Sequence, residues 1–199
     1  VGAVVLDEFH ERSLHADLAL ALVKQAAQAR GDLRVVVMSA TLDAQAVAHF
    51  LEGCPIIEVR GRLHPVDVAY RPGATVAQAA RELAPRTAGH LLCFLPGAPE
   101  IRRAGEELAG LTGRVVLPLH GSLSAEEQDL ALAPSSQPKI ILATNLAETS
   151  LTVEGVTDVI DSGLQKVVRY DAERGLDRLQ TERISQDSAE QRTGRAGRT

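Results

Sequence analysis

Two adjacent carboxylates, Asp7 and Glu8, stand directly after a short apolar run. In open α/β sheets, ligands bind beyond the carboxyl ends of the strands, so this position favours a functional pair. Two neighbouring acids suit phosphoryl transfer, because one can hold Mg²⁺ while the other orients or deprotonates an attacking water. A strand-end turn with two solvated acids explains the same residues. The pair alone leaves both interpretations open.

A short segment with two hydroxyl side chains, Ser39-Ala40-Thr41, follows the next apolar run. Hydroxyls at that strand end could bond back to the acids and report the state of a nucleotide. Ser and Thr are also common helix caps, and Thr41 or Asp43 could have only that role. This segment is therefore a weaker indication than the acids.

The most specific pattern is the run Gln191-Arg192-Thr193-Gly194-Arg195-Ala196-Gly197-Arg198. Its arginines recur every three residues, which on a helix places them on one side, and small residues between them let another surface approach. Guanidinium groups suit the spread charge of a transferring phosphoryl group. A solvated basic face would not need glycines at two fixed positions. Seven specified residues arise together by chance about once in 10⁹ start positions at average composition, so this run decides for phosphoryl transfer.

Composition excludes several classes of protein. The chain has 199 residues, 45% of them hydrophobic, which is enough for an ordinary core and speaks against disorder. No apolar run approaches the roughly 20 residues that span a bilayer, and no basic residue precedes the first apolar run as in a signal peptide. The sequence therefore predicts a soluble, cytoplasmic protein without membrane contact. Cys54 and Cys93 stand far apart and predict two buried thiols rather than a disulfide or a zinc site.

The net charge of -5 does not indicate a nucleic-acid binder. Three of the 21 basic side chains are lysines (Lys24, Lys139 and Lys166), and the other 18 are arginines. A protein can hold phosphates in a local cleft while its outer surface stays acidic. The net charge therefore neither supports nor excludes nucleic-acid binding, and is slightly unfavourable to it.

The elements that would position these residues alternate between apolar runs and helical patterns, which predicts an α/β sheet with right-handed crossovers. Leu14, Leu18, Leu22 and Ala26 would share one helix face, and Ser124 with Glu127 would form a capping box at the start of another helix. Strands are expected at 3–6, 35–38, 55–59, 90–95, 114–117 (closed by Pro118), 139–143 and 157–160, and helices at 14–29, 44–51, 75–86, 99–108, from 124 and from 188.

Two further features organise the chain. Glycines and prolines punctuate residues 60–74 and indicate a domain boundary, which we place between residues 62 and 63. Two extended stretches between Gln165 and Ile184 flank Ala172–Gly175 and predict a β-hairpin.

In order and type, these motifs resemble those of the DEAH-box ATP-dependent RNA helicases of superfamily 2. Asp7-Glu8-Phe9-His10 is similar to the DEAH box, with Phe in place of Ala, and Ser39-Ala40-Thr41 to the coupling motif. The run 143–152, ATNLAETSLT, resembles the fifth motif, the arginine run the sixth, and 119–123, LHGSL, a motif that faces nucleic acid. The form DEFHERSL at 7–14 is most similar to the bacterial HrpB-type branch.

The resemblance implies two RecA-like parallel-sheet lobes of the P-loop NTPase family, with ATP between them and a strand of RNA across both. Residues 1–62 would be the C-terminal part of an incomplete first lobe (the ATP-binding domain), and residues 63–199 the second lobe (the helicase C-terminal domain), truncated at its end. In the first lobe, the resemblance implies Mg²⁺ binding and water activation for Asp7 and Glu8, a link to the second lobe for His10, and coupling for Ser39 and Thr41. In the second lobe, it implies contact with the γ-phosphate for Gln191, Arg195 and Arg198, and ribose contact for Thr152 and Glu154. The residues implied to contact nucleic acid are Gly121, Ser122, Thr144, Asn145 and Thr149.

The sequence departs from the family pattern at three points. The sequence contains no GxxxxGK[ST] loop, so it predicts an internal piece of a longer protein that alone hydrolyses no ATP. Glu154 stands where relatives often have Asp, and no aromatic residue after Ser124 could stack on adenine. A related motor that acts on DNA remains an alternative, since backbone contacts do not settle the sugar. A non-catalytic nucleic-acid-binding or scaffold module is the other.

Overall fold

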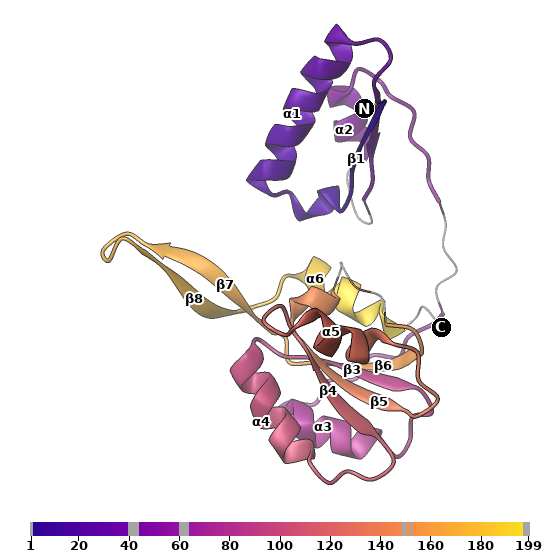
Figure 1. Cartoon of the computed structure of the whole chain (residues 1–199), viewed down its shortest axis with the longest axis vertical. Helices are drawn as coiled ribbons and strands as arrows, with labels where there is room; N and C mark the ends of the chain where they lie inside the picture. Colours follow the sequence, from indigo (N-terminus) through magenta and orange to yellow (C-terminus); the bar gives the residue numbers. More distant parts are fainter. Residues whose placement is uncertain (1, 40–43, 60–63, 149–150, 152, 197–199) are drawn as a thin grey trace. The chain divides into compact units, whose positions relative to one another are not determined.

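The computed structural model describes residues 2–39, 44–59, 64–148, 151 and 153–196. The chain divides into two compact units, Val1–Gly61 and Arg62–Thr199 (Figure 1). The division falls within the punctuated segment 60–74. Each unit is described by itself below.

The first unit is built on two parallel strands, β1 (Ala3–Leu6) and β2 (Arg34–Val37), in register from Ala3 opposite Arg34 to Leu6 opposite Val37. Helix α1 (Leu14–Ala29) connects them, as expected of a parallel crossover. Ser13 caps this helix by accepting a hydrogen bond from the Ala16 N–H. A short 3₁₀ helix, η1 (Phe9–Glu11), follows β1, and helix α2 (Ala44–Phe50) follows β2.

Two expectations for the first unit are corrected. The predicted strand at 55–59 is wrong, because these residues have no regular structure and Ile57 and Val59 are 84% and 85% exposed. A strand needs a neighbouring strand to pair with, and the described sheet of this unit has only two. Leu14, Leu18 and Leu22 are exposed, whereas the buried side chain of α1 is Leu20, so the regular leucine spacing does not mark the packed face.

The second unit contains a four-stranded parallel sheet in the spatial order β4-β5-β3-β6. The parallel order confirms the predicted α/β class. Its strands are β3 (His90–Phe94), β4 (Val115–Leu119), β5 (Lys139–Ala143) and β6 (Val156–Asp161), and its helices are α3 (Val76–Leu83), α4 (Ala98–Leu108) and α5 (Ala125–Leu132).

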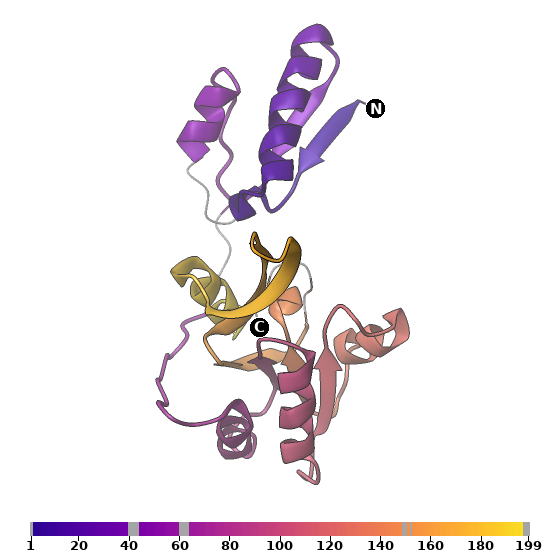
Figure 2. The same ribbon diagram turned by 90° about the vertical axis from the view of Figure 1, so that its left-hand side faces the viewer.

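Side chains of successive residues in the central strands enter two different cores, since neighbours along a strand point to opposite faces. Leu91 and Cys93 pack with α3 and α4 on one face, and Leu92 and Phe94 pack with α5 on the other. Figure 2 shows α3 and α4 side by side, with α5 across the sheet from them. The unit is therefore a three-layer α/β/α arrangement in which the two central strands, β3 and β5, are fully buried.

Helix ends in the second unit follow the local chemistry of the sequence. The predicted capping box is confirmed: the Ser124 hydroxyl accepts from the Glu127 N–H, and the Glu127 carboxylate accepts from the Ser124 N–H. Lys139 is buried and its ammonium donates to the carbonyls of Leu130, Ala131 and Ala133, which satisfies the C-terminus of α5.

Pro118 does not close the fourth strand but lies inside it. β4 is at one edge of the described sheet, so only one of its sides has to supply N–H groups to a neighbour. A proline, which lacks the N–H, is tolerated at such an edge.

The hairpin predicted between Gln165 and Ile184 is confirmed as β7 (Leu164–Asp171) paired antiparallel with β8 (Leu176–Arg183). Helix α6 (Gln186–Thr193) follows. It ends at Thr193, so Arg195 lies beyond the helix and the expectation of one helical row of arginines is wrong. In the described part of the chain, no helix is long and apolar enough to cross a membrane.

We expect the two cysteines to react at very different rates. Burial raises the pKa of the Cys93 thiol to about 12, whereas Cys54 is half-buried in the other unit. Only the thiolate is a good nucleophile, so iodoacetamide should modify Cys54 in the native protein and Cys93 only after denaturation. Peptide mass spectrometry over a time course measures both rates in one sample, and equal native rates would contradict the burial of Cys93.

Candidate functional site

The acids of the first unit lie at the carboxyl edge of its two-stranded sheet. Asp7 and Glu8 follow β1 directly. The Met38 N–H donates to the Leu6 carbonyl (2.8 Å), and the Phe9 N–H donates to the Met38 carbonyl (3.0 Å). These bonds place the acidic segment beside the residue after Met38, which is Ser39. The structure thus brings Asp7, Glu8 and Ser39 to one edge, as parallel strands require.

Glu8 has an unusual backbone conformation, with φ 51° and ψ 37° in the left-handed region. Such a conformation costs a non-glycine residue about 1–3 kcal/mol and is concentrated at functional sites. The Glu8 N–H donates to the Asp7 carboxylate at 2.8 Å. This bond fixes the Asp7 carboxylate relative to the backbone of Glu8.

His10 lies against Glu8. Its Nε2 is 3.4 Å from the Glu8 Oε2, and its side chain is 7% exposed, whereas that of Glu8 is 39% exposed. A nearly buried imidazole can hold the carboxylate in one orientation while leaving it accessible to water. Glu8 and His10 are therefore a pair in the structure. The link to the second lobe that is expected of His10 stays a prediction.

Phe9, the residue that departs from the DEAH pattern, belongs to the core of the first unit. It is 1% exposed, and the Arg12 guanidinium lies over its ring at 5.5 Å. A buried phenyl ring contributes substantial hydrophobic stabilisation, of about 1.5–3 kcal/mol. The ring therefore anchors the strained turn to the unit, which a methyl side chain would do less firmly.

The donor set at this edge fits Mg²⁺. This ion prefers hard oxygen ligands and usually takes one or two carboxylates while keeping waters and substrate phosphates. Asp7 is exposed and Glu8 is half-buried, so both carboxylates are accessible to an ion. Among the described residues there is no group of three or more acidic, His or Cys side chains that could form a complete protein cage. Two carboxylates are the pattern expected of a Mg²⁺–phosphate site.

In the second unit, the predicted nucleic-acid residues also lie at a carboxyl edge. Gly121 and Ser122 follow β4, and Thr144 and Asn145 follow β5, the strand next to it. The Thr144 N–H donates to the carbonyl of Leu119 at 3.2 Å, which ties the two strand ends together. The structure brings these four residues together.

Hydroxyl groups at this edge have local partners as well. The Ser122 Oγ is 2.9 Å from the His120 Nδ1, and the Thr144 Oγ1 accepts from the Leu146 N–H at 3.5 Å, which caps the short 3₁₀ helix η2 (Asn145–Ala147). A hydroxyl that accepts one bond still has a proton to donate. The edge therefore presents small donors suited to a phosphate backbone.

Arg192 is a buried residue whose contacts sequence reasoning missed. It is 1% exposed and joins three parts of the unit: its Nε donates to the Glu148 carboxylate at 2.8 Å, and its Nη1 donates to the Asp161 carboxylate at 2.8 Å and to the Leu164 carbonyl at 3.4 Å. The guanidinium also lies over the Phe94 ring at 4.7 Å. Arginine spacing gives no sign of this burial, because the partners come from distant parts of the sequence.

Arg195 lies against the backbone of the fifth-motif segment. Its Nε and Nη2 donate to the Glu148 carbonyl, with the Nε at 2.9 Å, and its Nη1 donates to the Leu151 carbonyl at 2.9 Å. The residue is 5% exposed. Gln191, on α6, is half-buried. The phosphate contacts expected of Gln191 and Arg195 stay predictions, and Thr41, Thr149, Thr152 and Arg198 lie outside the described residues.

Glu154 lies at the opposite edge of the same sheet. It precedes Gly155, whose carbonyl accepts from the N–H of His90, the first residue of β3. Glu154 and His90 line a hollow of about 360 Å³ together with Ser135. The structure therefore separates Glu154 from Thr144 and Asn145, and its ribose contact stays a prediction.

Comparison with known proteins agrees with these motifs. Residues 76–199 match the family described as the helicase conserved C-terminal domain. The chain is 48% identical to the ATP-dependent RNA helicase HrpB of Escherichia coli, over 100% of this chain and 26% of that protein. It is 41% identical to the ATP-dependent RNA helicase HrpA of Escherichia coli, over 98% of this chain and 16% of that protein. It is 41% identical to the probable ATP-dependent RNA helicase DHX34 of Mus musculus, over 98% of this chain and 19% of that protein.

The fold is similar to a solved structure over the whole chain. The crystal structure of the Escherichia coli DEAH/RHA helicase HrpB superimposes with a TM-score of 0.84 at 45% identity, covering 100% of this chain and 27% of that chain. The chain thus spans about a quarter of the length of HrpB, and less of HrpA and DHX34.

Replacement of Arg192 by Met should destabilise the protein strongly. The change leaves the carboxylates of Glu148 and Asp161, which are 12% and 22% exposed, without their cation, and removal of one partner of a buried pair costs about 3–5 kcal/mol. Urea denaturation monitored by circular dichroism measures the decrease in the free energy of unfolding. Arg169→Met is the matched control, because Arg169 makes the same kind of pair with Glu182 on an exposed strand and should change the midpoint little. Equal effects of the two changes would refute the proposed role of Arg192.

Proposed function

Since the chain belongs to the family of the helicase conserved C-terminal domain and carries DEAH-type motifs, we propose that the protein is an ATP-dependent RNA helicase, a motor that couples ATP hydrolysis to translocation on RNA and to its unwinding. One observation carries the proposal. Of the predicted site residues that the structure describes, all but Glu154 and Gln191 lie at, or are bonded to, the carboxyl edge of their sheet, where α/β proteins bind ligands.

Hydrolysis is assigned to the first unit. Asp7 and Glu8 would hold Mg²⁺, which supplies charge neutralisation for the β- and γ-phosphates when it is bound. Glu8 would also accept the proton of the attacking water, and His10, at 3.4 Å, would keep the Glu8 carboxylate oriented toward that water. Ser39 and Thr41 would sense the nucleotide from the neighbouring strand end.

The arginine segment would stabilise the charge of the transferring phosphoryl group. Gln191, Arg195 and Arg198 are assigned this role, with Thr152 and Glu154 at the ribose. Contact with a phosphate would exchange some of the bonds that the three guanidinium nitrogens of Arg195 make to the Glu148 and Leu151 carbonyls. A charged phosphate oxygen is a stronger acceptor than a carbonyl, which favours the exchange.

Nucleic-acid binding is assigned to the carboxyl edge of the second unit. Gly121, Ser122, Thr144, Asn145 and Thr149 would contact the sugar-phosphate backbone through small hydroxyl and amide donors, which position a strand without reading its sequence. The preference for RNA over DNA is supported by the relatives, each of which is named an RNA helicase. The cytoplasm, where both ATP and RNA are available, is the proposed location.

Replacement of Glu8 by Gln should abolish ATP turnover in the complete gene product. The amide keeps the size of the side chain but accepts no proton, so we expect a loss of roughly 10²–10⁴-fold in turnover with ATP binding preserved. Phosphate release and binding of a fluorescent ATP analogue measure the two properties. Glu126→Gln, an exposed glutamate on α5, is the matched control and should leave turnover unchanged. Turnover retained by Glu8→Gln would remove Glu8 from catalysis, and no turnover by the unmodified protein would favour the non-catalytic binding module.

The identity of the nucleic acid can be tested on the same protein. Single-stranded RNA should stimulate ATP turnover more than single-stranded DNA of the same sequence. Replacement of Thr144 by Val, which removes a hydroxyl donor and keeps the shape, should weaken this stimulation by roughly fivefold, the worth of about one hydrogen bond. Steady-state turnover against oligonucleotide concentration gives both results. Stimulation by DNA alone would establish the rival DNA motor.

A further inference from the structure

The hairpin of β7 and β8 projects from the second unit (Figure 1) and makes most of its contacts within itself. Its outer side chains are exposed, with Val168 at 59%, Tyr170 at 69% and Leu179 at 63%. The two strands pair without a bulge over eight residue pairs, from Leu164 opposite Arg183 to Asp171 opposite Leu176. The hairpin keeps its shape through its own pairing. Its direction is therefore determined at its root, the residues of β7 next to the sheet.

The hairpin is stiffened internally by its own side chains. Arg169 donates to both carboxylate oxygens of Glu182 across the strands, at 3.0 and 2.9 Å. At the turn, the Asp171 carboxylate accepts from the N–H groups of Glu173 and Arg174, and Gly175 supplies the positive φ of 64° that closes it. The hairpin therefore has its own internal contacts from the middle of its strands to the turn.

At the root, two basic side chains connect the hairpin to the rest of the unit. Arg192 donates to the Leu164 carbonyl, the first residue of β7. Lys166, two residues further along β7, donates to both carboxylate oxygens of Glu100, at 2.9 and 3.2 Å. Glu100 lies in the first turn of α4, where the helix dipole also stabilises its negative charge. The hairpin is thus fastened both to the arginine segment and to a helix on one face of the sheet.

The surroundings of Lys166 indicate that this contact is built into the fold. Its side chain is 24% exposed and that of Glu100 is 36% exposed. Burial acts to raise the pKa of the Glu100 carboxyl, but the hydrogen bond from Lys166, a hydrogen bond from its own backbone N–H, and the charges of Lys166 and Arg103 together hold this pKa below its usual value. Gly97 caps α4 with φ -170°, which any residue can adopt, yet an added Cβ would lie 2.8 Å from the Lys166 Nζ. The glycine leaves room for the end of the Lys166 side chain at this position.

We infer that the Lys166–Glu100 ion pair is a positioning device that fixes the direction of the hairpin relative to its sheet, and that unwinding depends on this direction. The second half of the inference rests on the proposed helicase function. Lys166 and Glu100 touch neither nucleotide nor phosphate in this assignment, so they act through the hairpin. The connection of the same root to Arg192 means that the hairpin is held by the arginine segment on one side and by α4 on the other.

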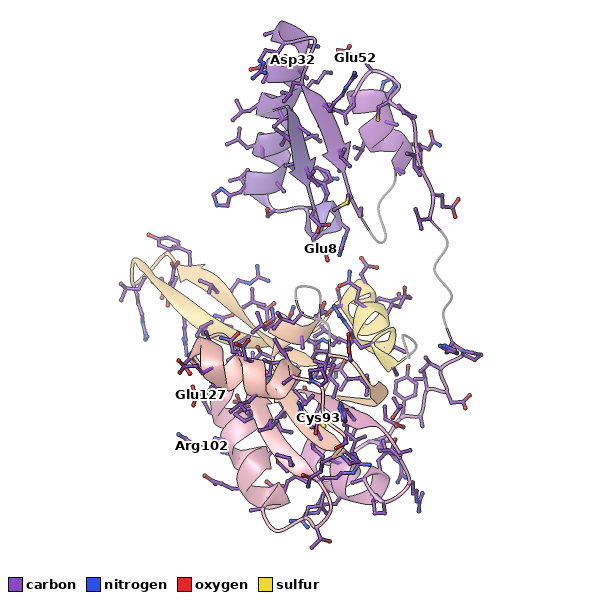
Figure 3. The ribbon with its side chains drawn as sticks, turned by 45° about the vertical axis from the view of Figure 1, so that its right-hand side comes forward. Glu8, Asp32, Glu52, Cys93, Arg102 and Glu127 are labelled. Carbon is purple, nitrogen blue, oxygen red and sulfur yellow. The ribbon has the colours of Figure 1, made fainter. Side chains whose placement is uncertain are left out.

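Glu100→Gln tests the device, with Glu182→Gln as the matched control. Both changes remove one carboxylate from a basic partner on β7, but only Glu100 lies outside the hairpin. Spin labels at Glu173 in the turn and at Arg102, exposed on α4 and labelled in Figure 3, report the direction of the hairpin in a Cys54→Ser background. Glu100→Gln should broaden the distance distribution between the labels, and Glu182→Gln, which leaves the eight backbone pairs of the hairpin intact, should broaden it much less. The exchange Glu100→Lys with Lys166→Glu should narrow it again.

The functional half is measured on the complete gene product without labels. Glu100→Gln should keep RNA-stimulated ATP turnover within about twofold, because it touches no reacting group. Duplex unwound per ATP hydrolysed should fall by roughly fivefold or more, since small displacements of a positioning element are costly. Partial rescue by the charge exchange would support the ion pair itself.

The outcomes separate the inference from the proposed function. An unchanged distance distribution in Glu100→Gln would overturn the positioning device, whatever the activity. A broadened distribution with unchanged unwinding per ATP would overturn its link to unwinding. Absence of RNA-stimulated turnover in the unmodified protein would refute the proposed function, while the spin-label result would still decide whether Lys166 and Glu100 position the hairpin.

Discussion

The buried guanidinium of Arg192 is the interaction on which the second unit depends. A charge that is 1% exposed loses nearly all of its hydration, a cost of several kcal/mol, unless its partners replace the water. Glu148, Asp161, the Leu164 carbonyl and the Phe94 ring do so from four segments of the chain. Hydrophobic contacts alone tolerate sliding, whereas four directed partners allow one position only. The arginine therefore fixes where the fifth motif, the end of β6 and the hairpin root lie relative to α6.

A second constraint comes from the parallel sheets themselves. Because all strands of a parallel sheet end at the same edge, residues that follow them gather there even when they are far apart in sequence. Asp7 and Ser39 meet in this way in the first unit, and Ser122 and Thr144 in the second. The left-handed backbone of Glu8 adds a local cost to this arrangement. Its neighbour Phe9, 1% exposed, stabilises the turn and offsets that cost.

These constraints explain which features could be predicted from sequence. Apolar runs with helical patterns between them predict α1 and most strands, and the strand-end rule places the acids and hydroxyls. The strand predicted at 55–59 is absent because an apolar run indicates only a preference for extended structure, and a strand also needs a neighbouring strand to pair with. Arg192 could not be distinguished from Arg195 by spacing, since its carboxylate partners lie 44 and 31 residues away. Burial of a charge is decided by such distant residues, not by the local pattern.

Glu148 is bound by two arginines through two different groups. Arg192 binds its carboxylate while Arg195 binds its backbone carbonyl. The two arginines belong to one short segment, so the arginine segment and the fifth motif form a single network in this state. If Arg195 exchanged the Glu148 carbonyl for a phosphate, Arg192 would still retain the Glu148 side chain. Thr144 and Asn145, a few residues earlier in the same connection, would then stay linked to the arginine segment through the Glu148 side chain.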